Sequence, residues 1–116
     1  MGANRDLGLP VRTMRDISIA FDVDGTLIDE NGEENVNIVR LLYILHGFKN
    51  VKIIVWSGGG KKYAEYQGHR LGLDKVIHRY ASKTEYPMIA PDIVIDDIQD
   101  TNLGTFNLIV REKMIQ

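Results

Sequence analysis

The chain has 116 residues, of which 44% are hydrophobic and 26% are charged, and its formal net charge is -2. Its length and composition are those of one globular domain, and they exclude a wholly disordered chain, a collagen-like repeat and a coiled coil. Because the chain contains no cysteine, disulfide frameworks, thiolate zinc sites, iron–sulfur clusters and cysteine nucleophiles are excluded as well.

Residues 1–13 contain no apolar run of the kind found in secretory signals, and no stretch approaches the roughly 18 apolar residues of a membrane span. Met14 has the character of a natural start, so we expect residues 1–13 to be an N-terminal arm or an added leader. Residues 14–116 are then expected to form a single domain. The lack of cysteine and of membrane segments favours a cytoplasmic location.

The first half of the chain is predicted to alternate strands and helices. Residues 17–23 are apolar and β-branched and end at Asp-Gly, which indicates a buried strand. Residues 35–46 carry apolar side chains at helical spacing and predict a helix that stops at Gly47. Residues 51–56 predict a second strand, and the three glycines at 58–60 mark its end. Residues 61–71 predict a second helix.

The second half is predicted to add three short strands, at residues 75–80, 93–95 and 107–110. The connection over residues 83–91 is short for a full helix, so we expect one crossover to be degenerate. The order strand, helix, strand, helix, strand, strand, strand predicts an α/β, Rossmann-like fold. Its sheet is expected to be mainly parallel and flanked by helices.

Acidic residues follow two of the predicted strands. Asp22 and Asp24 lie at the end of the first, while Asp96 and Asp97 end the run that begins at residue 93, with Asp100 close behind. Because ligands bind beyond the carboxyl ends of parallel strands, we expect an oxygen-rich site there. Crowded carboxylates repel, and Mg²⁺ relieves that repulsion with few carboxylates plus water. For either segment alone, an Asp-Gly turn or a helix cap is the simpler explanation.

Two further segments indicate contacts with a phosphate group. Ser57 precedes three glycines and a predicted helix, and bare glycine amides at a helix N-terminus form an anion cradle. Glycine-rich turns are weak evidence by themselves. Lys83 supplies a cation against a phosphate, and Lys61 and Lys62 compete with it because they follow the glycines directly.

These segments together resemble the haloacid dehalogenase-like (HAD) superfamily of phosphotransferases. The resemblance rests on FDVDGTL at 21–27, VWS at 55–57, a lysine at 83 and VIDD at 94–97, and it spans residues 17–110. It implies an HAD-type catalytic domain that hydrolyses phosphomonoesters with Mg²⁺ as cofactor. An aspartate two positions after the nucleophile is typical of the superfamily's phosphatases and phosphomutases.

The resemblance also implies a role for each matching residue. Asp22 is the nucleophile that forms an aspartyl-phosphate, and Asp24 is the general acid and base. The metal is held by Asp22, Asp96 and the backbone carbonyl of Asp24. The second acidic site residue is Asp97 if the pair is adjacent, or Asp100 if the spacing is D-x-x-x-D. Phosphate binding is assigned to Ser57, Gly58 and Lys83.

No cap domain is expected, because neither the loop after residue 27 nor the segment 58–82 has room for one. The open site would accept a nucleic-acid end, a phosphoprotein or a small phosphate ester. The basic segment 61–83 could steer an anionic substrate, and Trp56, Tyr63 and Tyr66 could stack a base, although a solvated face and ordinary packing explain these features more simply.

The sequence thus predicts a capless, Mg²⁺-dependent phosphatase, with two alternatives. One is a small-metabolite phosphatase whose lid is supplied by oligomerisation. The other is a catalytically weak phosphate- or partner-binding module on the same fold. Asp24 favours an enzyme, because a binding module has no need of a general acid.

Overall fold

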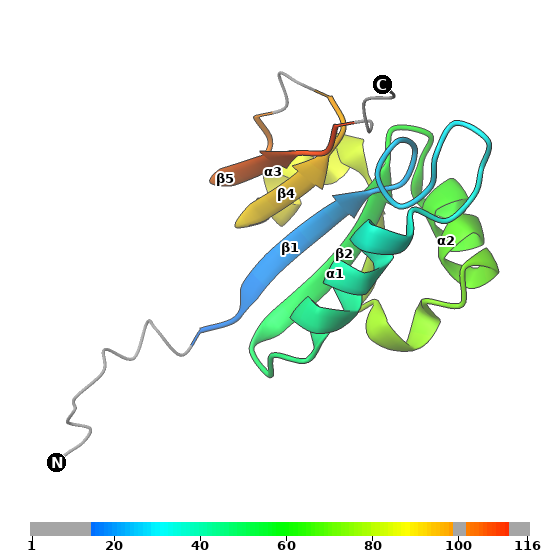
Figure 1. Ribbon diagram of the computed structural model, residues 1–116. Coiled ribbons are helices and arrows are strands. Elements are labelled where there is room, and N and C mark those ends of the chain that lie inside the picture. Colours follow the sequence, from blue (N-terminus) through cyan, green and yellow to red (C-terminus); the bar gives the residue numbers. More distant parts are fainter. Residues whose placement is uncertain (1–14, 99–101, 112–116) are drawn as a thin grey trace, which may run out of the picture.

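The computed structural model describes residues 15–98 and 102–111, and these residues form one five-stranded sheet with helices on both faces (Figure 1). The sheet order is β3-β2-β1-β4-β5, and every pair of neighbouring strands is parallel. This arrangement confirms the predicted α/β, Rossmann-like fold. The strands are β1 (Ile17–Asp22), β2 (Val51–Ser57), β3 (Arg79–Ser82), β4 (Ile93–Asp96) and β5 (Phe106–Ile109).

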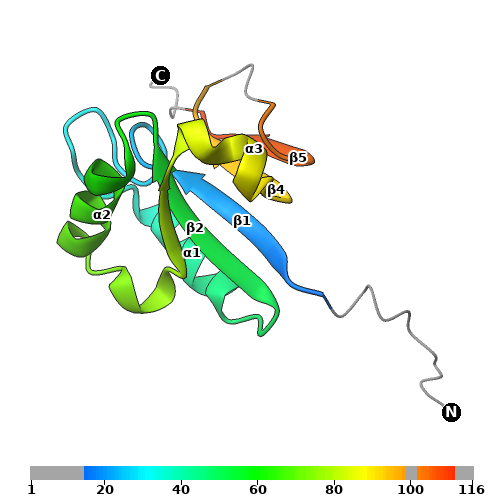
Figure 2. The same ribbon diagram turned by 180° about the vertical axis from the view of Figure 1, so that it is seen from behind.

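Helices α1 and α2 pack on one face of the sheet, and the single turn α3 lies on the other, as the two opposite views show (Figure 2). In the described part of the chain, no helix is long and apolar enough to cross a membrane. The α-helices are α1 (Val36–His46), α2 (Lys61–Arg70) and α3 (Tyr86–Ile89), and the 3-10 turns are η2 (Asp74–Val76) and η3 (Lys83–Glu85).

The third strand was predicted over residues 75–80, but β3 begins later, at Arg79, and ends at Ser82. The first part of this segment is the turn η2, and strand pairing with β2 begins only where Arg79 lies opposite Ile54. The turn buries Val76 in the larger hydrophobic core, so the chain gains more from packing Val76 there than from an earlier start of the strand. The degenerate crossover is confirmed, because only η3 and α3 join β3 to β4.

The buried side chains form two layers, one on each face of the sheet. The larger layer lies under α1 and α2 and includes Phe21, Leu42 and Ile53. The smaller layer surrounds Trp56, which is fully buried. Both layers hold β1 at the centre of the sheet, where the strand order changes direction between β1 and β4. In open α/β sheets, ligands bind beyond the carboxyl ends of the strands at this point.

Candidate active site

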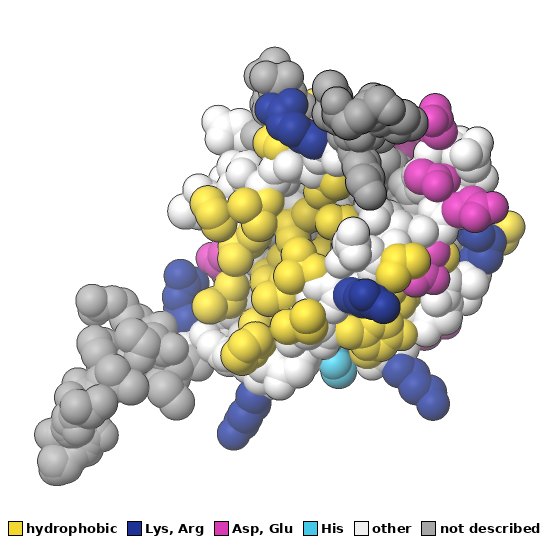
Figure 3. Space-filling view, in the orientation of Figure 1, with side chains coloured by type: hydrophobic (Ala, Val, Ile, Leu, Met, Phe, Trp, Pro, Cys, Tyr) yellow, Lys and Arg dark blue, Asp and Glu magenta, His cyan; other side chains and the backbone are white. Residues whose placement is uncertain are grey.

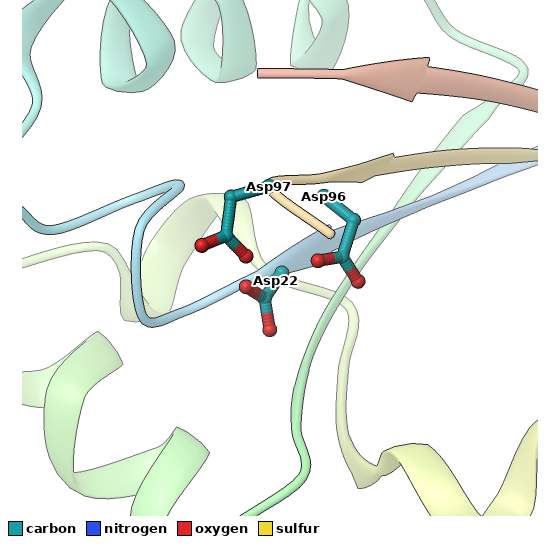
Figure 4. A group of neighbouring side chains, drawn as sticks. All are labelled: Asp22, Asp96 and Asp97. Carbon is teal, nitrogen blue, oxygen red and sulfur yellow. The ribbon is translucent and has the colours of Figure 1, made fainter. Parts of the chain in front are cut away.

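Three carboxylates meet where β1 and β4 end (Figure 4). Asp22 is the last residue of β1, Asp96 is the last residue of β4, and Asp97 follows it. One carboxylate oxygen from each residue lies within 4.8 Å of the others. Asp22 and Asp96 are buried, whereas Asp97 is exposed. The structure therefore brings together three of the acids that the sequence singled out, while Asp100 lies outside the described residues.

Lys83 lies between the two buried carboxylates. Its Nζ atom is 2.9 Å from Oδ1 of Asp22 and 2.7 Å from Oδ2 of Asp96. The lysine begins η3, and a capping box formed by Ser82 and Glu85 holds that turn at the end of β3. The crossover between β3 and β4 thus holds the backbone of Lys83, and the two ion pairs hold its ammonium group.

The competing lysines lie elsewhere. Lys61 and Lys62 are exposed at the start of α2. Of the three lysines that the sequence offered, Lys83 is the one that the structure places against the nucleophile candidate Asp22.

One lysine does not balance three carboxylates. Burial raises the pKa of Asp22 to about 7; hydrogen bonding to Lys83 opposes the shift, and the charge of Asp96 adds to it. Burial, followed by hydrogen bonding to Asp96, also raises the pKa of Asp97. Burial by itself lowers the pKa of Lys83, but its hydrogen bonds to Asp96 and Asp22 outweigh this and raise it. The site is therefore short of positive charge.

The carboxylates fit a divalent metal ion. Oδ2 of Asp96 is buried and, apart from the nearby ammonium of Lys83, has no well-aligned hydrogen-bond donor among the described residues. A second cation would compensate this oxygen and the excess negative charge. The donor set of Asp22, Asp96 and Asp97 offers only oxygen atoms, which suits Mg²⁺ with water completing its shell.

Asp22 has a second neighbour within its own motif. The buried hydroxyl of Thr26 donates a hydrogen bond to Oδ2 of Asp22, at 3.4 Å. The two oxygens of Asp22 therefore face different partners, Lys83 and Thr26. The sequence analysis did not assign a role to Thr26, although its place four residues after Asp22, in a turn, was a signal for this contact.

Asp24 lies apart from the three-carboxylate cluster. Its side chain is exposed, and Oδ1 accepts a hydrogen bond of 2.7 Å from the hydroxyl of Tyr63 on α2. Hydrogen bonding to Asp24, with burial, raises the pKa of Tyr63. The alternation of β1 ends before Asp24, because the carbonyl of Val23 accepts the amides of a tight turn over residues 26–28. The turn, rather than the alternation of a strand, therefore sets the direction in which the Asp24 side chain points.

The loop after β2 is tighter than the predicted cradle of free glycine amides. The amide of Gly59 donates to Oγ of Ser57 at 2.9 Å, and the amide of Gly60 donates to the Ser57 carbonyl at 3.2 Å. Among the turn and loop hydrogen bonds of the described residues, none uses the Gly58 amide. The loop thus offers an anion the Gly58 amide and the hydroxyl proton of Ser57, because Oγ of Ser57 already serves as an acceptor.

A groove of about 1110 Å³ opens beside the site. Neither expected insertion point carries a cap in the described residues, since 27–35 is a short loop and 58–82 holds only α2, η2 and β3. The groove is rich in acids rather than bases, and acidic side chains gather over the loop between β1 and α1 (Figure 3). The acids that line it are Asp24, Asp29, Glu30, Glu34 and Asp97.

The predicted basic steering surface is weaker than the sequence suggested. Arg70 donates to the Gly32 carbonyl, and Arg79 pairs with Glu85 at 3.3 Å. These two cations and Lys83 are therefore engaged within the fold. Of the aromatic residues considered for stacking on a base, Trp56 is fully buried and has no exposed face, whereas Tyr66 is 60% exposed.

Gly25 is required for the placement of Asp97. Gly25 has a φ of 79°, and a Cβ atom there would overlap Oδ2 of Asp97. We expect Gly25→Ala to displace Asp97 and to weaken Mg²⁺ affinity by about 10-fold or more, as measured by calorimetric titration. Gly32→Ala is the matched control, because Gly32 has a similar φ of 77° but nothing within 4 Å of its missing Cβ. An equal loss in both variants would show that backbone strain, not Asp97, is responsible.

No protein-family model, no curated protein and no solved structure matches this chain. Its function is therefore inferred from the chemistry that its own residues can perform. The relevant features are the three carboxylates, Lys83 between two of them, and the loop that begins at Ser57.

Proposed function

We propose that this protein is a capless, Mg²⁺-dependent phosphomonoester hydrolase of the HAD type, which works through an aspartyl-phosphate intermediate. The contact of Lys83 with both Asp22 and Asp96 at the carboxyl ends of β1 and β4 carries the proposal. A buried ion pair that serves only stability has no need of a second and a third carboxylate. A surplus of negative charge at a ligand-binding edge is instead typical of a site that takes a cation with its substrate.

The residues divide the reaction into two steps. A carboxylate oxygen of Asp22 forms a bond to phosphorus while the bond from phosphorus to the ester oxygen breaks, and Asp24 gives that oxygen a proton. Asp24 then takes a proton from water, whose oxygen attacks phosphorus and releases inorganic phosphate and the Asp22 carboxylate. When bound by Asp22, Asp96 and Asp97, Mg²⁺ shields the repulsion between the carboxylate and the phosphate dianion.

Lys83 and the Ser57 loop act on the phosphoryl group. The ammonium of Lys83 neutralises the nucleophile and the phosphoryl oxygens as charge moves between them. The hydroxyl proton of Ser57 and the amide of Gly58 donate hydrogen bonds to the same oxygens. These groups are held by β2, β3 and η3, so little reorganisation is needed when the substrate binds.

The acidic groove favours a small phosphate ester or a phosphoprotein over a nucleic-acid end. A polyanion that reached Asp22 through the groove would lie beside Asp29, Glu30 and Glu34, and like charges at that distance repel. A single phosphate on an uncharged or cationic leaving group does not meet this cost. Turnover of phosphate esters, phosphopeptides and phosphorylated oligonucleotides, compared in the presence of Mg²⁺, tests this preference.

Hydrolysis is expected to depend on Mg²⁺. A chelator should stop the hydrolysis of p-nitrophenyl phosphate, and added Mg²⁺ should restore it, whereas Ca²⁺ should restore little because it takes more ligands at longer distances. The measurement is the steady-state rate with each metal. The proposal fails if Zn²⁺ supports turnover that Mg²⁺ does not affect. It also fails if a panel of phosphate esters, phosphopeptides and phosphorylated oligonucleotides shows no turnover with Mg²⁺.

A further inference from the structure

Tyr63 links two parts of the site that are far apart in the sequence. Its hydroxyl donates a 2.7 Å hydrogen bond to Oδ1 of Asp24. Its ring packs against the larger hydrophobic core. The ring also lies beside the Ser57 loop, because the Cβ atom that Gly59 lacks would be 3.5 Å from it. Tyr63 is therefore anchored by the core and by the loop that is proposed to bind phosphate.

Asp24 has much less support of its own. It belongs to an exposed turn, and within residues 15–98 and 102–111 the Tyr63 hydroxyl is the one side-chain hydrogen-bond partner of its carboxylate. A free carboxylate in such a turn rotates among several orientations. A proton donor must be held close to the productive geometry to act efficiently.

We infer that Tyr63 is a positioning residue for Asp24 and sets which of its oxygens exchanges a proton with substrate and water. This inference rests on the proposed function. The Tyr63 hydroxyl occupies Oδ1 both when Asp24 is ionised and when it is protonated, because Oδ1 accepts a hydrogen bond in either state. Oδ2 is then the oxygen that carries the proton to the leaving group and later removes one from water.

The inference predicts an effect on proton transfer rather than on substrate binding. Tyr63→Phe keeps the ring and its packing but removes the hydroxyl, so Asp24 loses its restraint while the phosphate-binding groups stay in place. We expect kcat for an alkyl phosphate to fall about 10-fold with little change in KM. For p-nitrophenyl phosphate the fall should be clearly smaller, since its leaving group hardly needs a proton.

The experiment compares four proteins on these two substrates with Mg²⁺ present: the wild type, Tyr63→Phe, Tyr66→Phe and Asp24→Asn. Tyr66 is the matched control, because it lies on the same helix and is 60% exposed. Tyr66→Phe should match the wild type on both substrates. Asp24→Asn should show the same selectivity for leaving group as Tyr63→Phe, with a larger loss.

The ratio of the two kcat values decides the outcome. This ratio does not depend on the folded fraction of a variant, because both substrates are measured on the same preparation. If Tyr63→Phe lowers both rates equally, leaves both unchanged or raises only KM, the role assigned to Tyr63 is wrong while the proposed function stands. If the wild type has no Mg²⁺-dependent turnover on any phosphate ester, both are wrong.

Discussion

Asp22→Asn is expected to abolish turnover and, in the same protein, to stabilise the metal-free fold at neutral pH. The amide keeps the size of the carboxyl group but is no longer a nucleophile, so kcat should fall by about 10⁴-fold or more. The buried position would also lose a charge that the fold tolerates poorly without a metal ion. A residue that serves only the structure is not expected to combine these two effects.

The stability effect has a defined dependence on pH. Burial raises the pKa of Asp22 from 3.8 to about 7, so between these values the folded protein binds a proton that the unfolded chain releases. The contribution of Asp22 to the free energy of unfolding of the metal-free wild type should therefore decrease as the pH rises through this window. Asp22→Asn does not lose stability in this way. Its free energy of unfolding should therefore exceed that of the wild type at about pH 8, and the difference should be small at about pH 4.

Thermal unfolding in the presence of a chelator measures this difference. We expect the Tm of Asp22→Asn to exceed that of the wild type by several degrees at the higher pH. Asp24→Asn is the control, because it removes an exposed carboxylate two residues away and should show no comparable gain. A Tm difference that is the same at both pH values would contradict the proposed burial of an uncompensated charge.

The fold could be predicted from the sequence because its strands are short apolar runs with clear ends. Residues 19–23 and 53–56 are buried in the sheet, and most of their side chains are apolar, which is typical of a central parallel strand. The start of the third strand, predicted at residue 75 and found at Arg79, was wrong because the conformation of this segment depends on the packing of Val76 in the tertiary structure. Local patterns do not contain that information.

The candidate site could be predicted in its residue types but less well in its contacts. The acidic pairs at two strand ends indicated a shared edge, and the strand order β3-β2-β1-β4-β5 explains why Lys83 reaches it. The chain must pass from β3 at one edge, across the ends of β2 and β1, to reach β4. The hydrogen bond between Tyr63 and Asp24 spans 39 residues, and helical spacing gives no sign of it.

Lys83→Met should abolish the proposed hydrolase activity and destabilise the fold, in contrast to Asp22→Asn. Lys83 is 16% exposed and is the cation that faces both Asp22 and Asp96. Without it, two buried carboxylates are left uncompensated. We expect kcat to fall by about 10²–10³-fold and the free energy of unfolding at neutral pH to fall by about 3–5 kcal/mol.

The pH dependence separates this effect from a simple loss of packing. Because the pKa of Lys83 is raised above 10.5, its stabilising charge is present throughout the range below that value and is lost only when the pH rises through the folded pKa. The charge of Lys83 therefore does not change between about pH 5 and pH 8. A pH dependence of the difference between variant and wild type in that range comes from Asp22 and Asp97, whose raised pKa values let them take up protons at the lower pH. The stability deficit of Lys83→Met, measured by urea unfolding, should shrink at about pH 5.

Lys62→Met, at an exposed position on α2, should leave activity and stability nearly unchanged. A deficit that is equal at both pH values, or a Lys62→Met variant as damaged as Lys83→Met, would contradict the placement of Lys83 as the counter-charge of the site.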